Sequence, residues 1–150
     1  MGATTVWERW NSVLPDGKIS DTGMNSLNHY AYGAVSEWIY RSVCGIAPDE
    51  NTAGFKKAVL APCPDERFRW VKGEYASASG LYRSGWEYEG DHILYEAEIP
   101  FDCTAEFLVP EGMAVKSVNG TPAEERERLP LKKGVYRLIL ENCLLYTSDA

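Results

Sequence analysis

Near its start, the sequence places one carboxylate between two tryptophans, in the segment TTVWERW at residues 4–10. Glu8 follows Trp7 directly and precedes Trp10 by two residues. A carboxyl group in apolar surroundings can take or give a proton near neutral pH, as a general acid or base does. Tryptophan faces also suit sugars, whose rings present C–H bonds to the π cloud. In the structural alternative, Glu8 and Arg9 form a surface loop fixed by two core tryptophans, and a single glutamate by itself favours that alternative.

A histidine follows Glu8 after 21 positions, in the segment MNSLNHYAYGAVSEW at residues 24–38. His29 is expected near the N-terminus of a helix, where a neutral imidazole could hold a sugar hydroxyl or an oxyanion. The structural alternative is a histidine satisfied by a neighbouring backbone group. For an isolated histidine, this alternative is the more common one.

The element that must position His29 is predicted to be a helix over residues 26–44, because apolar residues recur there at spacings of three and four. Asn25 or Ser26 can cap its start, and Gly45 suits its end. The broad apolar stripe should pack against other helices, and Gly33 suits a close helix crossing. No second helix is obvious in the sequence, which indicates that helical partners lie upstream.

Residues 55–141 alternate apolar and polar residues in short stretches separated by turn formers. About six or seven strands of this kind favour a sandwich or jelly roll. Glu89-Gly90-Asp91 and Asn119-Gly120 are the expected turns. Aromatic residues recur on these strands and could form a sugar-binding face, although aromatics at a period of two are more often core: they are Trp70, Tyr75, Tyr82, Trp86 and Tyr88.

Composition excludes several classes of partner. There are 22 acidic and 15 basic residues, for a net charge of −7, and no basic patch, so we expect neither nucleic acid nor membrane as a partner. No apolar run approaches the roughly 20 residues of a membrane helix, and the N-terminus shows no signal peptide. The cysteines form no CxxC pair, so we expect no metal, no cofactor and isolated buried thiols, which favours a reducing, cytoplasmic location: they are Cys44, Cys63, Cys103 and Cys143.

TTVWERW followed by NHYAYGAVSEW closely resembles glycoside hydrolase family 78, the bacterial α-L-rhamnosidases. The joint pattern is far more specific than either segment alone. The resemblance continues loosely through the strands to about Asn142, and on the way it includes Tyr40-Arg41, Gly45-Ile46, Gly54-Phe55-Lys56 and Ala61-Pro62.

The resemblance implies an α+β fragment in which the final helix of an (α/α)6 barrel precedes an antiparallel β-sandwich or jelly roll. Residues 1–50 would be the end of the catalytic domain, and residues 51–142 the C-terminal β-sandwich domain. Residues 143–150, CLLYTSDA, break the pattern and are expected to be a non-native tail.

The family is similar to inverting glycosidases, in which one carboxylic acid protonates the leaving oxygen and a second carboxylate activates a water. The resemblance gives Glu8 the role of general base and makes His29 a rhamnose-binding residue, with Trp7 and Trp10 shaping the site. The general acid lies upstream in this family, so the chain is expected to be inactive alone. Its partners would be a rhamnose-containing glycoside, of plant glycosides or polysaccharides, and the upstream helices of the same protein.

The sequence alone leaves two alternatives open. The chain could be a non-catalytic carbohydrate-binding or structural β-sandwich module. It could also belong to another glycosidase with the same barrel, because a fold does not fix the sugar.

Overall fold

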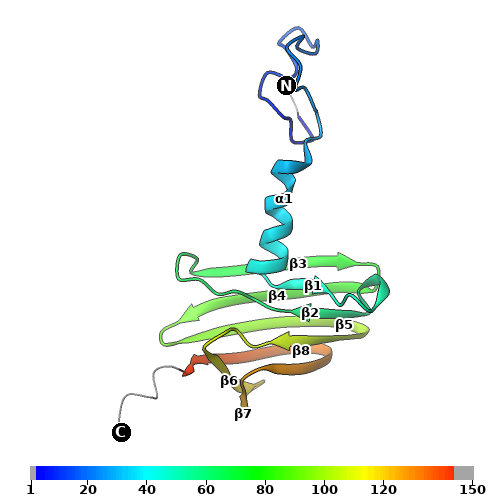
Figure 1. Ribbon diagram of the computed structural model, residues 1–150. Helices are drawn as coiled ribbons and strands as arrows, with labels where there is room; N and C mark the ends of the chain where they lie inside the picture. Colours follow the sequence, from blue (N-terminus) through cyan, green and yellow to red (C-terminus); the bar gives the residue numbers. More distant parts are fainter. Residues whose placement is uncertain (1–2, 144–150) are drawn as a thin grey trace. The chain divides into compact units, whose positions relative to one another are not determined.

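The computed structural model describes residues 3–143, which divide into two compact units, one ending at Trp38 and the other beginning at Ile39 (Figure 1). Within the described residues, no helix has both the length and the apolar character needed to cross a membrane.

The first unit consists of a loop region and one helix, α1, over Tyr30–Trp38. The helix begins at Tyr30 rather than at residue 26, so the prediction of its start was wrong. The reason is that the backbone just before Tyr30 is engaged elsewhere: the His29 amide donates to the Val6 carbonyl at 2.9 Å, and the Ser26 carbonyl accepts from the Glu8 amide at 2.8 Å. None of the residues of α1 is buried by the described chain, so its apolar side chains are exposed.

The second unit begins with a π-helical turn, η1, over Ile39–Val43, which carries Arg41 in its last turn. The predicted stop at Gly45 fits its φ of 74°, a left-handed value that favours glycine. A Cβ at this position would lie 2.2 Å from the backbone nitrogen of Pro62, so a side chain at position 45 would also clash with the neighbouring strand region.

Eight strands and one 3₁₀ turn follow η1 and form the sheet drawn in Figure 1. Their bounds are β1 Ile46–Pro48, η2 Ala53–Phe55, β2 Lys57–Leu60, β3 Trp70–Ser77, β4 Gly80–Glu89, β5 His92–Leu108, β6 Met113–Val118, β7 Thr121–Glu125 and β8 Arg128–Asn142. The strand order is β1-β2-β5-β8-β6-β7, and β3 joins through β4, which also pairs with β5. All these pairs are antiparallel except β2 with β5.

Two long strands, β5 and β8, turn this sheet into a sandwich. The first half of β5 pairs with β4, whereas its second half, from Thr104, pairs with β2. The register of β5 against β8 shifts between Ile99 and Thr104, next to Asp102, whose φ is 59°. Such a bulge bends a strand and lets one sheet fold over to form two layers.

The core lies between these layers, and the sequence periodicity predicted it well. Tyr82 and Trp86 of β4 are buried on one face of that strand, and a second set of residues is buried on one face of β5. That second set is Ile93, Tyr95, Ala97 and Ile99, followed by Ala105 and Phe107 beyond the bulge. Both predicted turns are present: Gly90 and Asp91 connect β4 to β5, and Asn119-Gly120 connects β6 to β7 with positive φ at both residues.

Polar atoms of the inner face of β4 bind the backbone that leads into the sandwich. The Trp86 indole N–H donates to the Val43 carbonyl at 2.8 Å, and the Ser84 hydroxyl donates to the Cys44 carbonyl at 2.6 Å. Tyr82 donates to the Phe55 carbonyl at 2.7 Å. Burial raises the pKa of the Tyr82 hydroxyl, so it stays a donor at ordinary pH.

Candidate active site

Two loop segments of the first unit bring Glu8 and His29 together. The segments 5–8 and 26–29 run antiparallel and exchange four hydrogen bonds. Three join Glu8 to Ser26 in both directions and the His29 amide to the Val6 carbonyl, and in the fourth the Thr5 hydroxyl donates to the Leu27 carbonyl. Residues that are 21 positions apart in the sequence therefore face each other.

The Glu8 carboxylate is held on one of its two oxygens. Its Oε2 accepts from the Ser26 amide at 3.0 Å, while Oε1 lies 3.6 Å from Nε2 of His29. The Glu8 and His29 side chains are only 17% and 28% exposed, respectively. Because 3.6 Å is too long for a hydrogen bond, Oε1 has the capacity to accept a proton from a water or a hydroxyl.

His29 presents one ring nitrogen to Glu8 and buries the other. Within residues 3–143, Nδ1 is buried and makes no hydrogen bond. The ring stacks parallel to Tyr30 with centroids 6.2 Å apart and lies tilted against Tyr32 at 5.4 Å. A buried nitrogen of this kind normally has a partner, so His29 has capacity left for a ligand or for a further protein group.

The residues around Glu8 form a hollow of about 880 Å³ within the first unit. Trp7 is half-buried, whereas Trp10 is fully exposed at the same hollow. Both predicted tryptophans therefore lie beside Glu8. The structural alternative required two core tryptophans, but Trp10 is not a core residue of the described chain. Tyr32 of α1 lines the hollow too, and no motif in the sequence had indicated this.

The neighbour of Glu8, Arg9, points into the loop of residues 20–25. Its Nε donates to the Met24 carbonyl at 3.1 Å, and its Nη2 donates to Asn25 Oδ1 at 2.8 Å. The same nitrogen reaches the hydroxyls of Ser20 and Thr22. Arg9 is therefore part of a hydrogen-bond network and not the exposed loop residue that the structural alternative described.

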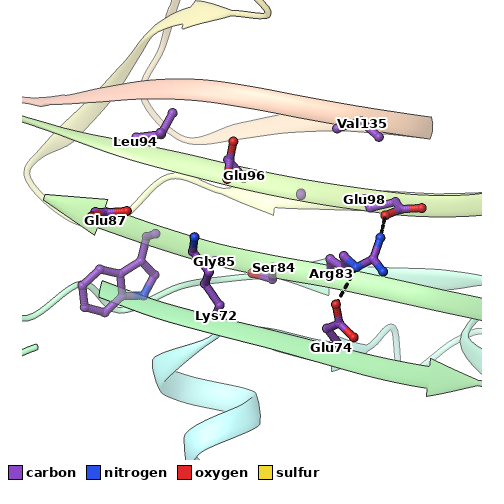
Figure 2. A pocket seen from close by; sticks show the side chains of 12 residues that line it. Lys72, Glu74, Arg83, Ser84, Gly85, Glu87, Leu94, Glu96, Glu98 and Val135 are labelled. Atoms are coloured by element: carbon purple, nitrogen blue, oxygen red, sulfur yellow. Dashed lines mark hydrogen bonds and ion pairs between the residues drawn. The ribbon is translucent and has the colours of Figure 1, made fainter. Parts of the chain in front are cut away.

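A second hollow lies on the outer face of the sandwich and is smaller, with a volume of about 420 Å³. Figure 2 shows Arg83 of β4 between Glu74 of β3 and Glu98 of β5, with ion pairs to both. The Nε of Arg83 lies 2.7 Å from the Glu74 carboxylate. Other acidic residues, Glu87 and Glu96, point to this face. Half of the residues that line this hollow are charged.

The aromatic side chains that could have made a sugar-binding face do not share one. Trp70 is 58% exposed and pairs with Glu87 on the outer face. Tyr82 and Trp86 are buried on the inner face, and Tyr75 contacts the Phe55 ring there at 4.6 Å. Tyr82 and Trp86 form core, as the period of two indicated, whereas Tyr75 is 39% exposed. Among the five aromatics, Trp70 lies on the outer face.

The cysteines are unpaired thiols in the described chain. Cys44 and Cys103 are buried as predicted, whereas Cys63 is exposed. Burial raises the pKa of the Cys44 thiol, so it behaves as an apolar core group. Among the described residues, no three His, Cys, Asp or Glu side chains cluster closely enough to bind a metal ion. The predicted non-native tail lies outside the described residues, except for Cys143.

The first unit combines a carboxylate close to an imidazole with a tryptophan-lined hollow, and a β-sandwich follows it in the sequence, an arrangement that fits the glycoside hydrolase class. The family model for the bacterial α-L-rhamnosidase C-terminal domain matches residues 45–124, and the one for the 6 hairpin glycosidase domain of the same enzymes matches residues 1–43. The chain therefore belongs to the bacterial α-L-rhamnosidase family.

Individual relatives agree with this assignment. The chain is 36% identical over 140 residues to an alpha-L-rhamnosidase of Alteromonas sp. (strain LOR), which covers 93% of the chain and 15% of the relative. An alpha-L-rhamnosidase of Streptomyces avermitilis is 38% identical over 109 residues, which cover 73% of the chain and 10% of the relative.

Solved structures show the same fold. The Streptomyces avermitilis alpha-L-rhamnosidase complexed with L-rhamnose has a TM-score of 0.65 at 32% identity, covering 91% of the chain and 14% of that structure. The alpha-L-rhamnosidase from Dictyoglumus thermophilum has a TM-score of 0.72 at 25% identity, covering 93% of the chain and 16% of that structure. The chain thus spans between 10% and 16% of the length of these relatives.

Proposed function

We propose that the chain is the C-terminal part of an inverting glycosidase that removes terminal α-L-rhamnose from plant-type glycosides or polysaccharides. The observation that carries the proposal is the Glu8 carboxylate, held by the Ser26 amide and placed 3.6 Å from His29 in a hollow beside two tryptophans. The relatives that the chain matches are α-L-rhamnosidases, which supports rhamnose as the sugar.

Glu8 would act as the general base. Its Oε1 takes a proton from a water as the water oxygen attacks the anomeric carbon of rhamnose. The bond from that carbon to the leaving oxygen breaks at the same time, and an acid on the opposite face protonates that oxygen. Attack from the face opposite the leaving group inverts the anomeric centre. The acid would come from an upstream part of the catalytic domain, roughly 6.5–9.5 Å from Glu8.

His29 and the tryptophans would bind the sugar. The Nε2 of the imidazole lies 3.6 Å from Oε1 of the base, so a rhamnose hydroxyl could bind beside these two atoms. Trp7 and Trp10 offer apolar faces at the same hollow, which suit the C–H bonds of a pyranose. Because the acid is expected upstream, the isolated chain should release no rhamnose.

Replacing Glu8 in the complete enzyme tests the proposal. Glu8→Gln keeps the shape of the side chain and removes the base, so kcat on an aryl α-L-rhamnoside should fall by about 10²–10⁴-fold. The matched control is Glu50→Gln, an exposed carboxylate of the second unit, which should keep wild-type activity. An undiminished kcat in Glu8→Gln would refute the assignment of the base.

Rescue by azide distinguishes the loss of a general base from the loss of a general acid. In Glu8→Ala the carboxylate is gone, and azide needs no deprotonation to attack the anomeric carbon. It should restore turnover and give β-L-rhamnosyl azide, with the aryl alcohol as the leaving group. Formation of the α anomer would contradict inversion.

The sandwich itself would serve a structural role in the same protein. Its tryptophan and tyrosine donors bind the Val43 and Phe55 carbonyls rather than facing outward for a ligand. If the sandwich were instead a separate carbohydrate-binding module, sugar binding by the chain would survive Glu8→Gln.

A further inference from the structure

The Arg9 side chain donates hydrogen bonds to four residues, and all four lie in one short loop, residues 20–25. The guanidinium binds the Met24 carbonyl at 3.1 Å, Asn25 Oδ1 at 2.8 Å and Ser20 Oγ at 3.4 Å, together with the Thr22 hydroxyl. The four acceptors are neutral oxygens. The positive charge of the Arg9 guanidinium is therefore stabilised by neutral oxygen acceptors, which we call the Arg9 cage.

The loop of residues 20–25 has a backbone conformation that needs contacts from its surroundings to persist. Gly23 and Met24 have φ values of 71° and 53°, and a left-handed residue other than glycine persists only where its surroundings enforce it. The Met24 carbonyl is the group that Arg9 Nε binds. Asn25 closes the loop by donating to the Ser20 carbonyl, and the Ser20 amide ties it to the Ser12 carbonyl at 3.0 Å.

The residue that leaves this loop is Ser26, whose amide holds the Glu8 carboxylate. Glu8 and Arg9 are adjacent in the sequence. The same segment therefore supplies the carboxylate and the guanidinium that fixes the loop leading to Ser26, whose amide binds that carboxylate. The path runs from Arg9 through Met24 and Asn25 to the Ser26 amide, and from there to Glu8 Oε2 at 3.0 Å.

We infer that Arg9 is a positioning residue for the general base, an inference that rests on the proposed role of Glu8. Arg9 fixes the loop 20–25, and the loop fixes the Ser26 amide against which the Glu8 carboxylate is aligned. A misplacement of about 1 Å at a reacting group can cost about 10²-fold in rate. Lysine cannot replace this function, because its single nitrogen cannot bind the acceptors that Nε and Nη2 serve at once.

The complete enzyme carrying Arg9→Ala tests the inference. We expect kcat to fall by about 10- to 100-fold while KM changes by less than about 2-fold, because the base is displaced and the sugar contacts remain. Guanidinium ion added to the assay should restore part of kcat by refilling the cage. Azide should not, because the displaced Glu8 is still present and repels an anion. The matched control is Lys18→Ala, an exposed cation of the neighbouring loop, which should behave as wild type.

Arg9→Lys keeps the positive charge and serves as a second variant in case Arg9→Ala does not fold. Its melting temperature should stay within a few degrees of wild type, and its kcat should still fall by about 10-fold. A wild-type kcat in Arg9→Ala or in Arg9→Lys would overturn the inference. So would a rate loss in a folded Arg9→Ala that guanidinium does not reverse. Full activity of Glu8→Gln would instead refute the proposed base, which is a separate result.

Discussion

Ser84 of β4 links two buried groups, and its removal should cost more than the loss of one hydrogen bond. Its hydroxyl lies 2.6 Å from the Cys44 carbonyl and 2.8 Å from the Tyr95 hydroxyl, and the side chain is 2% exposed. A carbonyl can only accept, so Ser84 donates to Cys44. Tyr95 must then donate to Ser84.

This direction of donation sets the size of the effect. Ser84→Ala leaves the Cys44 carbonyl and the Tyr95 hydroxyl without this partner, at about 1–3 kcal/mol each, so we expect a loss of about 2–6 kcal/mol in the free energy of unfolding. Tyr95→Phe removes only the donor and leaves the Ser84–Cys44 bond intact, so it should cost about 1 kcal/mol. In the double variant the orphaned hydroxyl is gone, and Tyr95→Phe should be neutral or stabilising there.

Urea unfolding of the chain, followed by far-UV circular dichroism, measures these differences. The control is Thr121→Ala, an exposed hydroxyl at the start of β7, which should change stability by less than about 0.5 kcal/mol. If the single losses at Ser84 and Tyr95 were equal and simply added in the double variant, donation from Tyr95 to Ser84 would be refuted.

Three further predictions concern pH, thiols and the helix. Burial raises the pKa of Tyr82, Tyr95 and Cys44 in the folded chain, so their contribution to stability is complete below about pH 9 and is lost as pH rises further; melting temperatures from about pH 7 to 11 check this. Cys63 should react with a thiol reagent in the native chain, whereas Cys44 should react only after unfolding, as peptide mapping of the labelled protein would show. Gly33→Ala should stabilise α1 by about 1 kcal/mol in the isolated chain, since nothing described lies within 4 Å of an added Cβ; if the predicted helix crossing exists, the same change should lower the melting temperature of the complete enzyme.

The sandwich was the part of the fold that the sequence predicted best. Its alternation of apolar and polar residues reflects a local rule, because successive side chains of a strand point to opposite faces. Tyr82 and Trp86 are therefore buried together, and the Asn119-Gly120 turn follows from the left-handed backbone that both residues tolerate. The bend in β5 was not predicted, because the bulge next to Asp102 depends on pairing with two different strands.

The sequence named the residues of the candidate site, and the structure brings Glu8 and His29 together, but their geometry was not predicted. The spacing from Glu8 to His29 identified the pair through a family resemblance. The distance between them is set by backbone hydrogen bonds to Val6 and Ser26, which any residue types could make. The same pairing moved the start of α1 to Tyr30, because hydrogen bonds between distant segments override the local helix preference.

The role of Arg9 was hidden for a related reason. Its acceptors include a main-chain carbonyl and hydroxyls at no regular spacing, so no periodic pattern marks them. In the structural alternative drawn from the sequence, Glu8 and Arg9 formed a surface loop fixed by two core tryptophans. In the structure the two side chains bind different partners, and only the folded loop reveals the connection between them.

Holding Glu8 with a main-chain amide has a consequence for how the site can evolve. Every amino acid except proline supplies the N–H that Ser26 now provides, so position 26 can drift through many residue types while the environment of the carboxylate stays the same. An alignment of relatives would then rank this position among the variable ones. Residues that hold reactive groups through their backbone leave little record in the pattern of substitutions, and in this chain that applies to Ser26, the residue whose amide holds the proposed base.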